Sequence, residues 1–229
     1  MDKEYSPLVT EENNAFLKLP EERQEAIANA AIEVFGRDTY KDASTEEIAK
    51  KAGISKGLLF FYCKNKKQLY LDTMDFLYEK VVSRVVDDHF WEIDDFFELL
   101  IYSARTKSAL FERFPWALSF CIRAYYPDHR DIKDTMNSWN QKQIDHVFDT
   151  FLKNVNWNKF RDDIEPKYVI NMLIWIADGW MHQQQASKKA ITLDALLNEF
   201  YSWIDMLRGW SYKPEYLLET NTDAAHMSN

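Results

Sequence analysis

The 229-residue sequence is poor in glycine, proline and cysteine, and each scarcity excludes a class of structure. With Gly 5 and Pro 6, the chain lacks the turn residues that a many-stranded β-fold requires. Cys63 and Cys121 form neither a CxxC pair nor a disulfide framework, which favours a reducing, intracellular compartment. No apolar run approaches the length of a membrane span, and the N-terminal segment has no signal-peptide core. We therefore expect a cytoplasmic protein without a membrane partner.

Apolar and aromatic residues are plentiful and follow a helical period. Hydrophobic residues make up 46% of the chain and aromatic residues 15%, enough for a sizeable core. A first helix is predicted to begin at Pro20, with an apolar face formed by Ile27, Ala30, Ala31, Val34 and Phe35. Later helices are expected over residues 66–89, 94–111, 116–125, 132–152, 166–188 and 193–210. Together with the two short helices described in the next paragraph, these segments predict an all-α protein of about nine helices.

Two short helices separated by a glycine turn follow the first helix. Ser44 with Glu47 three residues later forms a capping box, which predicts the start of the second helix. Gly53 ends that helix because it takes a positive φ without steric cost. Ser55 is suited to cap a third helix that runs through Tyr62. Helix, glycine turn, helix is the helix-turn-helix arrangement.

Positive charge gathers around this pair of helices, although the chain as a whole carries a formal charge of −9. Residues 41–67 hold seven lysines and three acids, a local net charge of +4. Ser55, Lys56 and Leu58 stand at the start of the third helix, the part of this motif that meets base edges in a major groove. Lysines 64, 66 and 67 follow where DNA phosphates would run. For the lysines at 64 and 67, a solvated surface role is an equal alternative.

The residues that carry the motif resemble a known family. "AIEVFGRDTYKDASTEEIAKKAGISKGLLFFYCKNKKQLY" is similar to the N-terminal DNA-binding domain of the TetR family of bacterial transcriptional regulators. The matching positions, over about residues 23–70, are Phe35, Tyr40, Ser44, Ile48-Ala49, Ala52-Gly53-Ile54-Ser55, Gly57, Phe61-Tyr62 and Lys66-Lys67-Gln68-Leu69. The chain departs from the family pattern at Thr39, Ala43, Phe60 and Cys63.

The resemblance assigns roles to individual residues. It implies that Ser44 and Thr45 touch phosphates and that the third helix enters the groove, with Leu58 against a thymine methyl group. The full set of DNA-binding residues implied is Ser44, Thr45, Ser55, Lys56, Gly57, Leu58, Phe61, Tyr62 and Lys66. Leu59, Phe60 and Leu69 are instead expected in the core.

The resemblance also implies a division of the chain and a dimer. We expect a loose arm over residues 1–17, the helix-turn-helix domain over 18–66, a helical ligand-binding and dimerisation domain over 67–212, and a tail over 213–229. Two recognition helices in a homodimer would read palindromic operator DNA. The predicted interface is an apolar set on the last two helices: Trp180, Leu196, Phe200, Trp203, Ile204 and Leu207. The same residues would also serve as the core of a single chain.

The larger domain offers residues for a small-molecule site. Helical spacing places aromatic and polar side chains on shared faces, as a ligand pocket needs. The predicted set is Trp116, Phe120, Tyr126, Trp139, Gln143, His146, Trp175 and Asp178. The expected effector is small and hydrophobic or aromatic, and the acids of the chain would also suit a cationic one. Each of these aromatic residues would equally serve as plain core.

These patterns predict a regulator, usually a repressor in this family, that leaves DNA when an effector binds. One rival is an all-helical enzyme with metal–diphosphate chemistry, because "DDFFE" at residues 94–98 looks like the acidic motif of class I terpene synthases. The other rival is a DNA binder that senses no small molecule. HExxH, GxSxG, P-loop and GxGxxG motifs are missing, so we predict no enzyme, no catalytic residue, no metal and no cofactor.

Overall fold

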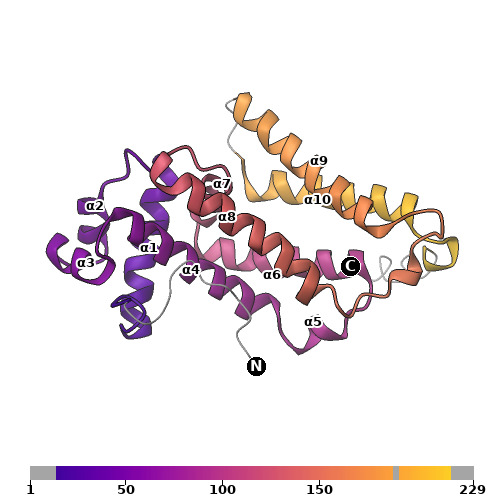
Figure 1. Ribbon diagram of the computed structural model, residues 1–229, viewed down its shortest axis with the longest axis horizontal. Coiled ribbons are helices and arrows are strands. Elements are labelled where there is room, and N and C mark those ends of the chain that lie inside the picture. The colour runs from indigo at the N-terminus through magenta and orange to yellow at the C-terminus, as the bar shows by residue number, and fades with distance from the viewer. Residues whose placement is uncertain (1–13, 188–190, 218–229) are drawn as a thin grey trace, which may run out of the picture. The chain divides into compact units, whose positions relative to one another are not determined.

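The structure is a computed structural model that describes residues 14–187 and 191–217, with the side chain of Phe148 excepted. Within these residues ten α-helices form, and the all-α prediction is confirmed. They are α1 (Glu21–Arg37), α2 (Thr45–Lys51), α3 (Lys56–Cys63), α4 (Lys66–Val85), α5 (Asp88–Glu92), α6 (Phe96–Arg113), α7 (Ala117–Tyr125), α8 (Arg130–His146), α9 (Pro166–Ala186) and α10 (Leu193–Ser211) (Figure 1). Residues 1–13 of the predicted arm and 218–229 of the predicted tail lie outside the described residues.

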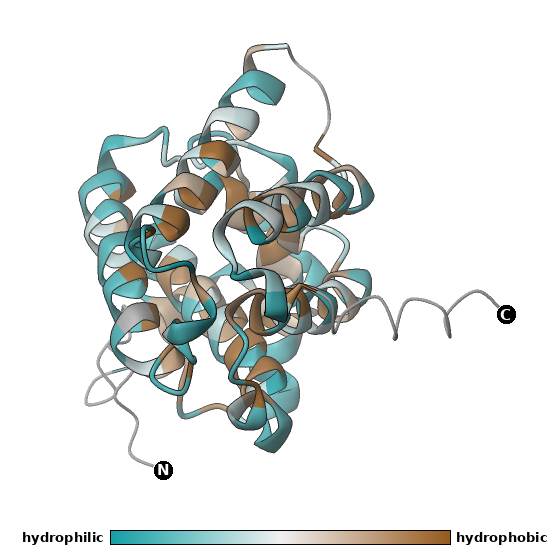
Figure 2. Cartoon of the chain, turned by 90° about the vertical axis from the view of Figure 1, so that its right-hand side faces the viewer, coloured by the Kyte–Doolittle hydropathy of each residue, from teal (hydrophilic) through white to brown (hydrophobic). Residues whose placement is uncertain are grey.

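The chain divides into two compact units. Unit 1 comprises residues 1–87 and 106–153, and unit 2 comprises residues 88–105 and 154–229. Helix α6 contributes its first part to unit 2 and its second part to unit 1. In Figure 2 the helices carry apolar residues on one face and polar residues on the other, the pattern of helices that bury one side.

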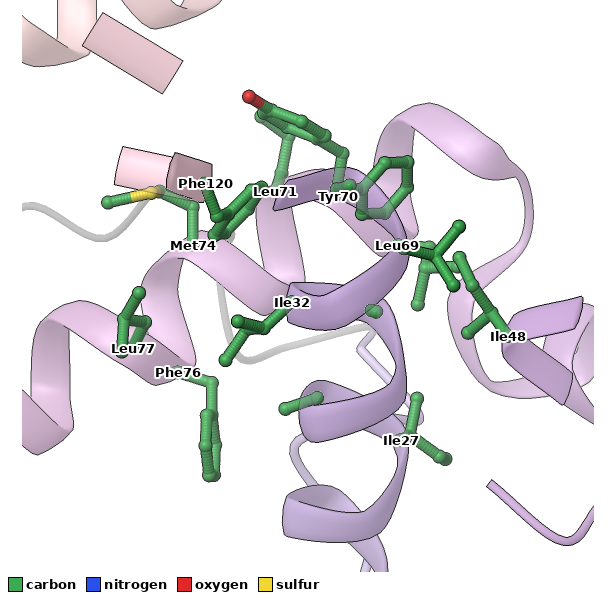
Figure 3. Close-up of a cluster of buried hydrophobic side chains, with 14 of the residues drawn as sticks. Ile27, Ile32, Ile48, Leu69, Tyr70, Leu71, Met74, Phe76, Leu77 and Phe120 are labelled. Atoms are coloured by element: carbon green, nitrogen blue, oxygen red, sulfur yellow. The ribbon is translucent and has the colours of Figure 1, made fainter. Parts of the chain in front are cut away.

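Unit 1 is built around α1, which packs against α2, α4 and α7. Figure 3 shows the core that results: Ile27 and Ile32 of α1 face Leu69, Met74 and Leu77 of α4, beside Ile48 and Phe120. The same hydrophobic cluster continues to Met136 and Trp139 of α8. The helix-turn-helix therefore shares one core with α4, α7 and α8. The domain boundary predicted at residue 66 separates expected functions and stays a prediction.

Glycine lets α1 and α7 approach closely. A Cβ atom at Gly36 would lie 2.6 Å from the backbone oxygen of Trp116 and 3.0 Å from its Cβ. Arg123 of α7 donates a hydrogen bond from Nε to the Gly36 carbonyl, at 3.1 Å, and from Nη2 to the Arg37 carbonyl, at 3.3 Å. These bonds satisfy carbonyl groups that the end of a helix leaves unpaired.

The residues just before α1 are packed against unit 1. Phe16 is fully buried, and the Asn14 Nδ2 donates to Asp72 Oδ1 of α4 at 2.6 Å. Gln68 donates to the same oxygen at 3.0 Å. The predicted arm therefore ends in an anchored segment, because the Phe16 ring is buried in the hydrophobic cluster and the Asn14 amide binds α4.

Unit 2 has an aromatic core and a set of ion pairs. Phe97 and Phe160 contact Tyr212 edge-on, with ring centroids 5.0 and 4.9 Å apart. Tyr212 donates a hydrogen bond to Asp95, at 3.2 Å. Helices α9 and α10 lie side by side in this unit, with Trp180 against Trp203 (Figure 1).

Two predicted helices end earlier than their apolar pattern suggested. The helix expected over residues 66–89 ends at Val85, and α5 begins at Asp88, where acidic residues favour a helix N-terminus. The helix expected over 132–152 begins at Arg130, because His129 caps it, and changes into a π-helical turn over Val147–Phe151. Pattern reasoning places helix ends only to within a few residues.

Candidate DNA interface

Local side-chain bonds shape the helix-turn-helix as the sequence predicts. The Ser44 Oγ accepts the backbone N–H of Glu47, and the Ser55 Oγ accepts that of Leu58, at 3.3 and 3.2 Å. Gly53 has φ of +68° and turns the chain between the two helices. Both caps and the turn are formed by residues within four positions of one another, so α2 and α3 are set by local sequence.

The carboxylate of Glu47 has a partner other than the reciprocal bond of a capping box. It receives two bonds from the Arg37 guanidinium, at 2.9 and 2.8 Å, and Arg37 also binds Asp38. These bonds hold the pKa of Glu47 below its usual value. Lys51 of α2 pairs with Glu33 of α1 at 2.9 Å. Exposed pairs contribute little stability each, but together they fix the orientation of α2 on α1.

Helix α3 buries one face and exposes the other. Leu59 and Cys63 are buried, and Leu69 of α4 is fully buried, as predicted for Leu59 and Leu69. On the opposite face Ser55, Lys56 and Gly57 are exposed. Leu58 is 38% exposed and Phe61 is 71% exposed. Both side chains lie on the face that the sequence predicts to contact DNA.

The remaining predicted contact residues surround this face. Ser44 is exposed and Thr45 half-buried at the start of α2. Tyr62 is half-buried and stacks edge-on against Phe61, with ring centroids 5.6 Å apart. The Lys56 Nζ lies 3.7 Å from the Glu46 carboxylate. The face therefore presents hydroxyl, ammonium and apolar groups together, the mixture that reads DNA phosphates and base edges.

Lys66 has a structural partner. Its Nζ donates to the Lys41 carbonyl at 3.0 Å and lies 5.1 Å from the centre of the Tyr40 ring. Burial lowers its pKa. Lys66 thus ties the start of α4 to the loop before α2, and a phosphate contact would add to that role.

The turn between α3 and α4 is held in an unusual conformation. Lys64 has φ of +58° and ψ of −52°, and it is the one non-glycine residue with positive φ in the described part of the chain. The Asn65 N–H donates to the Cys63 carbonyl across it, which makes a γ-turn. Asn65 then caps α4 by accepting the Gln68 N–H at 2.9 Å. The recognition helix is therefore joined to α4 by a short turn with stored strain.

The predicted effector residues are distributed over the two units. Trp116, Phe120, Tyr126, Trp139, Gln143 and His146 belong to unit 1, and Trp175 and Asp178 belong to unit 2. Phe120 is fully buried and contacts Tyr70 edge-on, with ring centroids 5.0 Å apart. Trp139 is buried against Tyr78, whereas Trp116 is 38% exposed and Trp175 is 64% exposed.

The residues predicted for the dimer interface fall into two groups by their burial. Trp203, Ile204 and Leu207 are buried within the single chain. Trp180, Leu196 and Phe200 are half-buried. The large exposed apolar side chains of α9 and α10 are instead Tyr168, Trp175, Met206 and Trp210. Of these four residues, only Trp175 belongs to a set predicted from the sequence, as an effector residue. Helical spacing could have linked them in pairs, because positions 168 and 175 are two turns apart and positions 206 and 210 are one turn apart.

The acidic segment at residues 94–98 is engaged inside unit 2. Lys159 binds Asp94 and Asp95, at 2.8 and 3.3 Å. Asp95 Oδ1 also accepts the N–H groups of residues 97 and 98 and so caps α6. Arg208 binds Glu98 at 2.5 Å. Among the described residues no group of three or more His, Cys, Asp or Glu side chains is placed to hold a metal ion.

Comparisons with known proteins agree with this geometry. The pattern of the family described as "Bacterial regulatory proteins, tetR family" matches residues 27–73. An uncharacterised HTH-type transcriptional regulator, YuxN of Bacillus subtilis (strain 168), is 32% identical over 66 residues, 29% of this chain. The matched stretch spans 23% of the length of that relative.

Solved structures resemble most of the fold. The fatty acid degradation regulator FadR from Bacillus halodurans has a TM-score of 0.63 at 16% identity, covering 81% of this chain and 98% of its own. A TetR-family regulator from Rhodococcus sp. has a TM-score of 0.61 at 13% identity, with coverage of 82% and 100%. NalD, the secondary repressor of the MexAB-OprM multidrug efflux pump in Pseudomonas aeruginosa, has a TM-score of 0.55 at 17% identity, with coverage of 85% and 98%.

An all-helical chain with a capped, exposed recognition helix after a glycine turn is a helix-turn-helix protein. The family pattern over residues 27–73 makes the assignment narrower. Over residues 27–73 the chain matches the TetR family of bacterial regulatory proteins. No helix among the described residues is long and apolar enough to span a membrane.

Proposed function

We propose that this protein is a transcriptional repressor that binds palindromic operator DNA as a homodimer in the cytoplasm and leaves it when a small apolar effector binds. The observation that supports DNA binding best is the exposed face of α3. Leu58 and Phe61 are presented to solvent while Leu59 and Cys63 anchor the helix from behind. Two such helices on a two-fold axis would read two half-sites about one helical turn apart.

DNA binding is tested by anisotropy with labelled DNA flanking the gene of this protein and with unrelated DNA, at two salt concentrations. Specific binding keeps its preference for one DNA at the higher salt, whereas simple phosphate attraction disappears. Equal affinity for both DNAs at both salt concentrations would refute operator recognition at that site.

Two matched lysine variants make the test specific to α3. Lys56→Ala and Lys142→Ala remove the same charge from an exposed lysine, the first on α3 and the second on α8. We expect only Lys56→Ala to weaken binding to all DNAs and to reduce the salt slope by about 1. Leu58→Ala is expected to reduce the preference for the operator without changing the slope, because an apolar contact displaces no counterion.

The proposed dimer interface is the outer face of α9 and α10. Tyr168, Trp175, Met206 and Trp210 are 54%, 64%, 58% and 46% exposed. Large apolar side chains gathered on one helix pair are typical of subunit interfaces. Trp203, Ile204 and Leu207 would support this face from inside the chain.

Sedimentation of two variants tests the dimer. Trp175→Glu is expected to sediment as a monomer and to lose operator affinity, because one recognition helix reads too few base pairs. Phe61→Glu changes an equally exposed aromatic residue of unit 1 and is expected to remain a dimer while losing DNA binding. A dimeric Trp175→Glu variant would refute this interface.

Effector release is the third part of the proposal. Helix α4 begins directly after the γ-turn that ends α3 and carries core residues of unit 1, so a ligand among the unit 1 helices would act on α3 through it. Release then depends on the difference in ligand affinity between two arrangements of the dimer. A DNA binder without sensing would show the same operator affinity with every effector tested.

A further inference from the structure

The Asp72 carboxyl group of α4 is buried in unit 1, where two different segments bind it. Asp72 is 1% exposed. Its Oδ1 accepts hydrogen bonds from Asn14 Nδ2, at 2.6 Å, and from Gln68 Nε2, at 3.0 Å. Its Oδ2 is buried and has no hydrogen-bond partner in the described part of the chain. The carboxyl group is therefore held through one oxygen, by two amide groups.

Asn14 lies in the segment before α1 and uses both polar atoms of its amide group. Its Nδ2 donates to Asp72, and its Oδ1 accepts the Phe16 N–H at 3.0 Å. Asn14 is 4% exposed, and the Phe16 ring is fully buried. Gln24 of α1 donates to two carbonyl groups of the same segment, at 3.2 and 2.8 Å. Residues 14–19 are thus fixed on unit 1 by burial and by hydrogen bonds.

Gln68 connects the buried carboxyl group with the turn that ends α3. Its side chain donates to Asp72, and its backbone N–H donates to Asn65 Oδ1 at 2.9 Å. The Asn65 N–H donates in turn to the Cys63 carbonyl across the γ-turn. Four hydrogen bonds in series therefore lead from Asn14 to Cys63, the last residue of the recognition helix.

The two ends of α3 are held in different ways. At its start Ser55 caps the helix by accepting the N–H of Leu58, three positions away. At its end the chain passes through Lys64, whose positive φ is unfavourable for a residue with a side chain. A strained turn keeps its conformation only where the surrounding structure holds it, and the series of hydrogen bonds provides such support. Side chains that read DNA must be held to within about 0.5 Å, so the position of this turn matters for Leu58 and Phe61.

We propose that Asn14 is a positioning residue for operator binding, which acts through Asp72 and Gln68 on the end of the recognition helix. The inference rests on the proposed DNA-binding function. It gives a role in that function to a residue outside the family pattern at residues 27–73, in a segment that the sequence predicts to be a loose arm. Asn14 is itself buried, so its effect on DNA is indirect.

A purely structural role of Asn14 is the alternative, and it predicts a different result. The buried Phe16 ring anchors the same segment, so we expect Asn14→Ala to fold. A residue that only stabilises the fold changes the fraction of folded protein, but not the affinity of the folded protein for DNA. Operator affinity measured well below the melting temperature of each variant therefore separates the two roles.

Fluorescence anisotropy with the flanking DNA and the unrelated DNA described above measures the positioning effect. We expect Asn14→Ala to weaken binding to the operator by about 2- to 30-fold, the range for residues that act on a site through others. The salt slope is expected to stay unchanged, because the variant removes no charge. A folded Asn14→Ala variant with the operator affinity of the wild type would overturn the proposal.

Asn140→Ala is the matched control. Asn140 of α8 donates from Nδ2 to the carbonyl groups of Ala124 and Tyr125, at 3.4 and 3.3 Å. The variant therefore also loses two hydrogen bonds of an asparagine in unit 1, but these join α8 to α7. We expect it to bind the operator like the wild type. An equal loss of operator affinity in both variants would mean that any loosening of unit 1 weakens DNA binding, which would contradict the positioning role.

Gln68→Ala tests the series of hydrogen bonds from its other side. The variant removes the bond to Asp72 and keeps the backbone bond to Asn65. We expect the same loss of operator affinity as in Asn14→Ala, and no further loss in the double variant, because both residues act along one route. Additive losses would show that the two residues act separately and would refute this route. Should Asn14→Ala fail to fold, the operator affinity of Gln68→Ala decides in the same way.

Failure of this inference differs from failure of the proposed function. A wild-type protein that prefers neither DNA would refute operator recognition, and the positioning role with it. A wild-type protein with a clear operator preference, which both Asn14→Ala and Gln68→Ala retain, would refute the positioning role alone.

Discussion

Replacing Gly36 by alanine tests the close approach of α1 and α7. In an exposed helix interior, this change stabilises a protein by up to about 1 kcal/mol, because alanine has the higher helix propensity. At Gly36 the new Cβ would lie 2.6 Å from the Trp116 carbonyl oxygen and 3.4 Å from the Phe120 N atom. Both are backbone atoms, so no side-chain rotation relieves the contact.

The two effects oppose each other, and the steric one is the larger. Overpacking a close helix contact costs about 1–3 kcal/mol, and the shift would also lengthen the Arg123 bonds to the end of α1. After the gain in propensity is subtracted, we expect the free energy of unfolding of Gly36→Ala to fall by about 1–2 kcal/mol.

Gly57→Ala is the matched control in the same unit. Its Cβ would have one neighbour, the Ser55 Oγ at 4.0 Å, so the variant is expected to be at least as stable as the wild type. Urea unfolding followed by circular dichroism compares the variants, at one protein concentration because the stability of a dimer depends on it. A Gly36→Ala variant as stable as Gly57→Ala would refute the close approach of α1 and α7.

Three further substitutions address strain, a buried carboxylate and an ion network. Lys64→Gly is expected to stabilise the protein by about 1 kcal/mol in urea unfolding, because glycine adopts the γ-turn at φ of +58° without strain; a loss of stability would contradict the turn. Burial raises the pKa of Asp72, so its proton stabilises the folded state below the unfolded pKa, and this contribution disappears as the pH rises through the folded pKa. The free energy of unfolding of Asp72→Asn relative to wild type should therefore increase from pH 4 to pH 8, and a pH-independent difference would contradict it. Arg208→Ala leaves Asp95 and Glu98 without this partner, and thermal unfolding should show a loss of about 3–5 kcal/mol; a near-neutral effect would mean that Lys159 neutralises the site alone.

The recognition helix shows how much of the site a sequence can predict. Ser44, Gly53 and Ser55 act on backbone groups within a few positions of themselves, so their roles follow from the local sequence alone. The capping-box prediction was only half confirmed, because the Glu47 carboxylate binds Arg37, ten positions away on another helix.

The inward faces of α9 and α10 were harder to predict. An apolar stripe shows that a helix buries one side, but it does not show whether the partner is the same chain or a second subunit. Trp203, Ile204 and Leu207 proved to be buried in the single chain, whereas Met206 and Trp210 are exposed. The choice depends on packing against elements that are far away in the sequence.

The sequence by itself determined the helical class, the caps, the glycine turn and the match of residues 27–73 to the TetR family pattern, because these depend on residues within a few positions or at fixed short spacing. Tertiary structure alone decided which acids Lys159 binds, because Asp94 and Asp95 are 65 and 64 positions away. It also decided the contact of Gly36 with α7, about 80 positions later. Such contacts arise only when packing brings distant segments together, and local propensity carries no information about them.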